Sequence, residues 1–282
     1  MVMLAQQTAT RRKFGGYKGE KPKIVREVKV EENQAVRQIV QAFQNYHPNY
    51  PLGAKDEALY EEVAELVRDI DYSATDVTKF SIMLKEFEEK EYFTTIAGYF
   101  LSALINSGNE TDYRIEAGNL PEIDYLGTFN TKNITVIGNV GDNLGQGMRG
   151  GSIVVFGDTY GDLGHSLEQG EIVVKGHVAG NIGPGMKGGR ITIEGNAGDM
   201  IGGAMEGGEI IILGGAGDDV GCYHCIKEIA RVWDFERISP ETHLIQPMKG
   251  GKIVVEGNIG RRPGLFAEGG QIIHKGKIIF DK

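Results

Sequence analysis

The sequence predicts a mainly β protein in which a parallel β-helix of about seven 19-residue coils follows a small α-helical domain. Of the 42 glycines, 34 lie between Gly138 and Gly276, where short Ile/Val-rich runs recur at a fixed spacing. Residues 31–108 instead carry apolar side chains at helical spacing. We therefore expect a basic flexible arm over residues 1–30, a helical domain with a connection over 31–130, and the β-helix over 131–282.

The expected arm is the one strongly basic part of an acidic chain. It has eight basic residues against two glutamates, whereas the whole chain has a net charge of −9. The net negative charge of the whole chain argues against nucleic-acid binding over its whole surface. The basic excess of residues 1–30 suits a solvated arm that docks on an acidic partner. A nucleic-acid-binding arm is the alternative. The basic residues are Arg11, Arg12, Lys13, Lys18, Lys21, Lys23, Arg26 and Lys29.

Four apolar stripes predict four amphipathic helices that pack as a small bundle. We expect Thr75 or Asp76 to be the N-cap of the third helix and Gly108 to end the fourth. Residues 109–130 are predicted to be an irregular connection. The stripes are Val36, Ile39, Val40 and Phe43; Leu59, Val63, Leu66, Val67 and Ile70; Val77, Phe80, Met83, Leu84 and Phe87; and Ile96, Tyr99, Phe100, Ala103 and Leu104.

Seven four-residue runs, each followed by a glycine, predict the stacked strands of the β-helix. Nineteen residues are too few for a helical repeat, and the Ile/Val content suits strands. The first and third positions of each run are apolar, so we expect them to point inward. One interval is 43 residues long because it contains a 24-residue insert, which we place within 222–249. The runs begin at Ile134, Ile153, Ile172, Ile191, Ile210, Ile253 and Ile272.

Charged residues at the fourth position of neighbouring runs predict two ion pairs, Lys175 with Glu194 and Glu256 with Lys275. His274 occupies a position that is apolar in the other runs. It indicates that the last coil is a cap, which disfavours end-to-end growth of the solenoid.

The glycine pattern resembles a known family. The tract Gly138-Asn-Val-Gly141-Asp-Asn-Leu-Gly-Gln-Gly-Met148-Arg-Gly-Gly151 and its successors are similar to the GXGXG domain. That domain is the C-terminal β-helix of the large subunit of glutamate synthase, and it also forms the C subunit of formylmethanofuran dehydrogenase. The resemblance covers residues 134–280, and the coil at 257–264 is closer to the formylmethanofuran dehydrogenase form. It implies a right-handed β-helix that packs against catalytic domains or subunits without carrying catalytic residues itself.

The insert contains the most chemically distinctive residues of the β-helix. Cys222, His224 and Cys225 are candidate metal ligands, with His243 as a further candidate. A lone C-x-x-C without a second pair favours packing cysteines, and a metal site and then a redox pair are the alternatives. Trp233 and Phe235 of the insert would suit a partner interface. The tracts 145–150 and 183–188 match G-x-G-x-x-G, yet their periodic recurrence favours coil corners over nucleotide binding.

We therefore expect a non-catalytic scaffold or interaction subunit of a multi-subunit metabolic oxidoreductase. Its partner subunits would carry flavin, Fe–S clusters or molybdopterin with molybdenum or tungsten. Self-association, or a stand-alone homo-oligomer with hydrolase or metal/redox activity at the insert, is the alternative. The chain has two cysteines and no apolar run of about 20 residues, so we expect a cytoplasmic protein that binds neither membrane nor nucleic acid.

Overall fold

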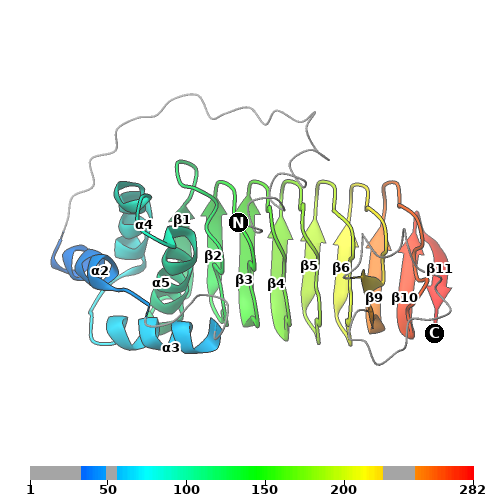
Figure 1. The fold of residues 1–282 in the computed structure, drawn as a ribbon, viewed down its shortest axis with the longest axis horizontal. Helices are drawn as coiled ribbons and strands as arrows, with labels where there is room; N and C mark the ends of the chain where they lie inside the picture. The colour runs from blue at the N-terminus through cyan, green and yellow to red at the C-terminus, as the bar shows by residue number, and fades with distance from the viewer. Residues whose placement is uncertain (1–32, 49–55, 225–244) are drawn as a thin grey trace. The chain divides into compact units, whose positions relative to one another are not determined.

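The computed structural model describes residues 33–48, 56–224 and 245–282. It confirms the predicted fold class, a parallel β-solenoid of about seven turns preceded by a small helical part (Figure 1). From Glu32 onward the chain forms one compact unit, and a single hydrophobic core extends from Ile39 in the helices to Ile272 in the solenoid. The expected arm lies outside the described residues. No helix in the described ranges is both long and apolar enough to span a membrane.

The four predicted helices are confirmed, with one correction at a helix start. The N-cap predicted at Thr75 or Asp76 is wrong, because Ser73 caps this helix. Asp76 accepts a hydrogen bond from the Ser73 backbone at 3.1 Å, which completes a capping box. Gly108 ends the last helix, as predicted. The helices are α2 (Gln34–Asn45), α3 (Asp56–Val67), α4 (Ala74–Met83), the 3₁₀ helix η1 (Leu84–Phe87) and α5 (Phe93–Ser107).

Nine strands form one sheet in the order β1-β2-β3-β4-β5-β6-β9-β10-β11. All neighbours are parallel except β10 and β11, which are antiparallel. Strands β7 and β8 form a separate two-stranded ribbon. The bounds are β1 (Asp112–Glu116), β2 (Asn133–Ile137), β3 (Arg149–Phe156), β4 (Gln169–Val174), β5 (Arg190–Ile193), β6 (Glu209–Ile212), β7 (Cys222–His224), β8 (Ile245–Pro247), β9 (Lys249–Val255), β10 (Gly269–His274) and β11 (Lys277–Asp281).

The register of the strands confirms the predicted repeat. The first isoleucine of each run pairs with the first isoleucine of the next, and all seven are buried. Ile210 pairs directly with Ile253, so the insert leaves the stacking undisturbed. The predicted ion pair between Lys175 and Glu194 is present. Lys275, predicted to pair with Glu256, instead lies in the hairpin turn before β11. Its Nζ donates to Asn258 Oδ1 at 3.3 Å.

The solenoid begins one coil earlier than the sequence predicts. Residues 109–130 are not an irregular connection, because β1 pairs in parallel with β2 and Tyr113 lies opposite Ile134. Ile123 forms a further parallel bridge with Val140. This first coil is offset by 21 residues from the next where its strands pair, so it falls outside the 19-residue period.

The coil corners require glycine because the backbone of the neighbouring coil lies directly beside them. A Cβ added to Gly170 would lie 2.7 Å from the Gly151 carbonyl oxygen, and one added to Gly251 would lie 2.9 Å from the Gly208 carbonyl oxygen. Both glycines have positive φ, of 98° and 82°. The Gly-rich corners therefore allow the backbones of successive coils to approach closely.

Helices α4 and α5 cover the outer end of the first coil (Figure 1). On β1, the Arg114 carbonyl accepts from Thr78 Oγ1 at 2.7 Å, and the Glu116 N–H donates to Ser81 Oγ at 3.0 Å. Buried Ser102 of α5 accepts from the Gly127 N–H at 2.8 Å. These hydroxyls satisfy backbone groups that an uncovered sheet edge would leave unpaired. The helical part is thus the cap of the solenoid.

Candidate functional site

The insert leaves the solenoid at a tight corner and returns to it through the ribbon of β7 and β8. In the preceding coil, two residues, Gly203 and Ala204, connect Gly202 to Met205. At the insert, residues 222–247 stand in the place of these two residues. The Met248 N–H donates to the Gly221 carbonyl at 3.0 Å and closes the coil. The insert therefore ends at residue 247 and is shorter than the predicted 222–249. Met248, which is buried, and Lys249, which begins β9, belong to the regular coil.

The structure places only part of the predicted metal or redox site. Cys222 lies in β7 opposite Pro247 and is buried. Burial, reinforced by the charge of Asp219, raises the pKa of its thiol to about 12, so the thiol is protonated at neutral pH. His224 pairs with Ile245 through its backbone. Cys225 and His243 lie outside the described residues, as do Trp233 and Phe235. Among the described residues, no group of three or more His, Cys, Asp or Glu side chains could hold a metal ion.

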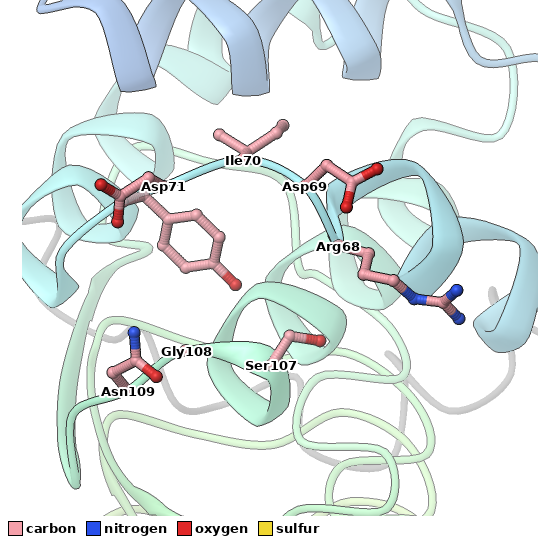
Figure 2. Close-up of a pocket in the computed structure, with 8 residues that line it drawn as sticks. Arg68, Asp69, Ile70, Asp71, Ser107, Gly108 and Asn109 are labelled. Atoms are coloured by element: carbon pink, nitrogen blue, oxygen red, sulfur yellow. The ribbon is translucent and has the colours of Figure 1, made fainter.

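A polar hollow of about 290 Å³ lies between the α3–α4 turn and the C-terminal end of α5 (Figure 2). Arg68 and Asp71 lie on opposite sides of the view, and Ser107, Gly108 and Asn109 form the floor. The guanidinium of Arg68 is already paired with Glu65. Tyr72, which also lines the hollow, donates its hydroxyl to the Leu104 carbonyl at 2.8 Å, and burial raises its pKa. The Tyr72 hydroxyl thus joins the α3–α4 turn to α5, whereas the Arg68–Glu65 pair is local to the end of α3.

Three aspartates occupy successive coils near the capped end, and each uses a carboxylate oxygen to bind the next coil. Asp124 accepts from the Asp142 N–H at 2.8 Å, Asp142 from the Asp162 N–H at 2.6 Å, and Asp162 from the Asn181 N–H at 3.1 Å. Burial, followed by the charge of Asp142, raises the pKa of Asp162 to about 6. These carboxylates have a structural use, which weighs against assigning them to hydrolase chemistry.

The outward face of the sheet carries a strip of mostly apolar residues, which we call the outer strip. It comprises Val154, Val173, Thr192, Ile211, Val254 and Ile273, the second residues of six successive runs. They are in register from strand to strand, and each is half-buried. A solvent-facing column of a half-buried sheet is normally polar. The apolar composition of these positions is visible in the sequence, where it identifies strands but not a surface.

Charged residues border the outer strip on both sides, and two exposed apolar side chains lie among them on one side. On one side, the Glu209 carboxylate pairs with Arg190 at 2.9 Å and with Lys252 at 3.0 Å. On the other side lie the Lys175–Glu194 pair and the exposed side chains of Phe156 and Leu213. An apolar centre with a polar border is the usual composition of a protein–protein interface. The outer strip is the candidate functional surface that the described residues support best.

The comparisons with known proteins add no relative. No protein family matches the sequence, and neither a curated protein nor a solved structure is similar enough to count as a match.

Proposed function

We propose that this chain is a non-catalytic scaffold subunit or domain that docks on a catalytic subunit of a metabolic oxidoreductase through its outer strip. The proposal takes the kind of partner from the resemblance of the glycine repeats to the GXGXG domain. The observation that carries the docking is the in-register column of apolar side chains on the outward face of the sheet. The partner is expected to carry flavin, Fe–S clusters, or molybdopterin with molybdenum or tungsten.

The geometry of the outer strip supports docking on a folded partner. Its residues stand on strands that are hydrogen-bonded to both neighbours, so the surface is pre-formed and loses little conformational entropy on binding. Its six side chains are β-branched and therefore stiff about χ1. The bordering ion pairs can exchange partners with a complementary rim and thereby fix the orientation of the complex.

Affinity purification of the tagged chain from its native cells tests the proposal. We expect co-purification of a larger subunit, with flavin absorbance or with iron, molybdenum or tungsten in elemental analysis. Replacing Val173 and Ile211 together by lysine places two charges in the strip, and recovery of that subunit should fall at least about tenfold. The exposed residues Gln169 and Glu206, replaced together by lysine, are the control outside the strip. This control should retain the partner.

Two results would contradict the proposal. One is purification of the chain from native cells without any cofactor-bearing subunit. The other is a partner that binds the Val173→Lys/Ile211→Lys variant as well as it binds the wild-type chain. Far-ultraviolet circular dichroism of each variant identifies a loss of binding that is due to unfolding.

A further inference from the structure

The outer strip continues beyond β10 onto the last strand. In the hairpin of β10 and β11, Ile278 lies opposite Ile273, the last member of the strip, and its side chain is 57% exposed. Residues directly opposite each other in a strand pair have side chains on the same face of the sheet. Ile278 therefore extends the apolar column to the end of the sheet (Figure 1).

A β-bulge in β11 places Ile278 on this face. Ile272 pairs with Phe280 and Ile273 with Ile278, so the pairing skips Ile279. In a regular strand, residues two positions apart, such as Ile278 and Phe280, point to the same face. The bulge instead allows Phe280 to pack against the core while Ile278 points outward. The last strand thus closes the bore of the solenoid and also lengthens the outer strip.

The outer strip is narrow, with one apolar side chain per strand between two columns of mostly charged and longer side chains. The two columns are four residues apart along a strand, which is about 13 Å. One α-helix with its side chains has a similar diameter, roughly 10–12 Å. A broad partner sheet would cover both columns and remove water from their charges, which is costly. The columns are Glu171, Arg190, Glu209 and Lys252 on one side, and Lys175, Glu194, Leu213 and Glu256 on the other.

An occupant of this face must satisfy its own backbone hydrogen bonds. Each strand of the sheet from β2 to β10 is paired with a neighbour on both sides, so the backbone beneath the strip is already used. An extended segment laid on the strip would bury unpaired N–H and C=O groups, whereas an α-helix pairs these groups within itself. Backbone pairing and the width of the strip therefore both favour a helix.

We propose that one amphipathic α-helix of the partner subunit lies along the outer strip, across the strands, from β3 to β11. This inference rests on the proposed function and names the element that docks. The strip crosses seven strands of the sheet, from β3 to β11. Six intervals of about 4.8 Å give a length of about 29 Å, which corresponds to a helix of about 19 residues.

The charges beside the strip specify the flanks of this helix. Glu171, Arg190, Glu209 and Lys252 alternate in sign from strand to strand. Their spacing of about 4.8 Å is close to the pitch of an α-helix, about 5.4 Å. The two columns together hold four carboxylates and three basic groups, so the border has little net charge. A helix with both signs on its flanks therefore fits better than a uniformly basic or acidic one.

Photo-crosslinking of the purified complex tests this placement. p-Benzoylphenylalanine is introduced singly at Val173, Ile211 and Ile278 of the tagged chain, and mass spectrometry identifies the residues of the co-purified subunit to which each attaches. All three should attach to one continuous segment, in order. Val173 and Ile211 are two strands apart, and Ile211 and Ile278 are three strands apart. A helix predicts attachment sites about six and about ten residues apart, whereas an extended segment predicts about three and about four.

Two lysine substitutions test the extension of the strip onto β11. Ile278→Lys should lower recovery of the subunit at least about tenfold, because it places a charge under the end of the helix. Leu265 is the matched control, since it is 56% exposed but lies outside the strands. Leu265→Lys should retain the subunit. Far-ultraviolet circular dichroism of both variants identifies any loss of recovery that is due to unfolding.

The outcomes separate this inference from the proposed function. Cross-links that fall on several segments, or at the spacing of an extended chain, would overturn the helix and leave the docking in place. Full recovery of the subunit by Ile278→Lys would overturn the extension onto β11. Failure to recover any cofactor-bearing subunit would contradict the proposed function, and this inference with it.

Discussion

Gly98 allows α5 to lie directly against the first coil of the solenoid. A Cβ added at this position would be 1.7 Å from the Asp124 carbonyl oxygen, a backbone atom that cannot move without the first coil. Helix propensity alone predicts that Gly98→Ala stabilises α5 by about 1 kcal/mol. We expect the opposite sign, a loss of about 2–4 kcal/mol in the free energy of unfolding, because the clash must separate the two elements. Urea denaturation measures the difference.

The control for this prediction is another glycine. Gly150 has no atom within 4 Å of an added Cβ, so Gly150→Ala should change the free energy of unfolding by less than about 0.5 kcal/mol. If Gly98→Ala were as stable as the wild-type chain, the close approach of α5 to the first coil would be wrong.

Asp162 makes stability depend on pH. Its folded pKa of about 6 lies above the usual value near 3.9 for an unfolded aspartate, because burial and the charge of Asp142 disfavour the carboxylate. The folded state therefore binds this proton more tightly, and the contribution to stability is lost as pH rises from about 4 through 6. Asp162→Asn should raise the free energy of unfolding by on the order of 1–2 kcal/mol at pH 8, but not at pH 4.

An asparagine can still accept the backbone N–H of Asn181, so the coil contact is retained. Asp218 is the contrasting control, since hydrogen bonds from Arg261 lower its pKa. Asp218→Asn should therefore destabilise the protein at pH 8. Thermal unfolding at both pH values measures the two variants, and a stability gain from Asp162→Asn that is equal at pH 4 and pH 8 would contradict the assignment.

At the scale of elements, the sequence predicts a strand well where its neighbours repeat it. The runs from Ile134 to Ile272 are recognisable because each one stacks on a copy of itself, which imposes the same inward isoleucine at 19-residue spacing. Strand β1 is not predicted from the sequence, because it packs on helices on one side and on a repeat strand only on the other. Tyr113 replaces the leading isoleucine there, and the segment that follows is longer. A capping coil is shaped by its cap rather than by the repeat.

Strand β11 escapes prediction for a different reason. Its signal is a two-residue turn, Lys275-Gly276, between two apolar runs, and both residues adopt positive φ as a hairpin turn requires. Gly276 also fits the 19-residue glycine period, so the sequence pattern assigns it to a coil corner rather than to a hairpin turn.

The candidate site is less predictable than the fold. Cys222, His224 and Cys225 are predicted as metal ligands from their residue types alone. A ligand set also depends on side-chain geometry, which sequence spacing does not specify. Burial of Cys222 and its protonated thiol are consequences of tertiary packing. The outer strip, in contrast, consists of ordinary valines and isoleucines with one threonine, which are informative only once the register shows that they point outward together.

At the scale of the whole molecule, the helices and the solenoid depend on each other because they share one core. Tyr99 of α5 stacks on Tyr125 of the first coil with ring centroids 4.9 Å apart. A chain that begins at residue 109 would expose this surface together with the edge of β1. We expect such a chain to aggregate on expression, since edges and apolar patches that are normally covered become available to other chains.

A chain that begins at residue 33 separates this effect from truncation in general, because it keeps the contacts between the helices and β1. It should remain soluble, whereas the shorter chain should elute in the void volume during size-exclusion chromatography. Solubility of the shorter chain would mean that the first coil is stable without its cap. The hydroxyls of Thr78 and Ser81 would then be incidental contacts, and protection of the β1 edge would need another explanation.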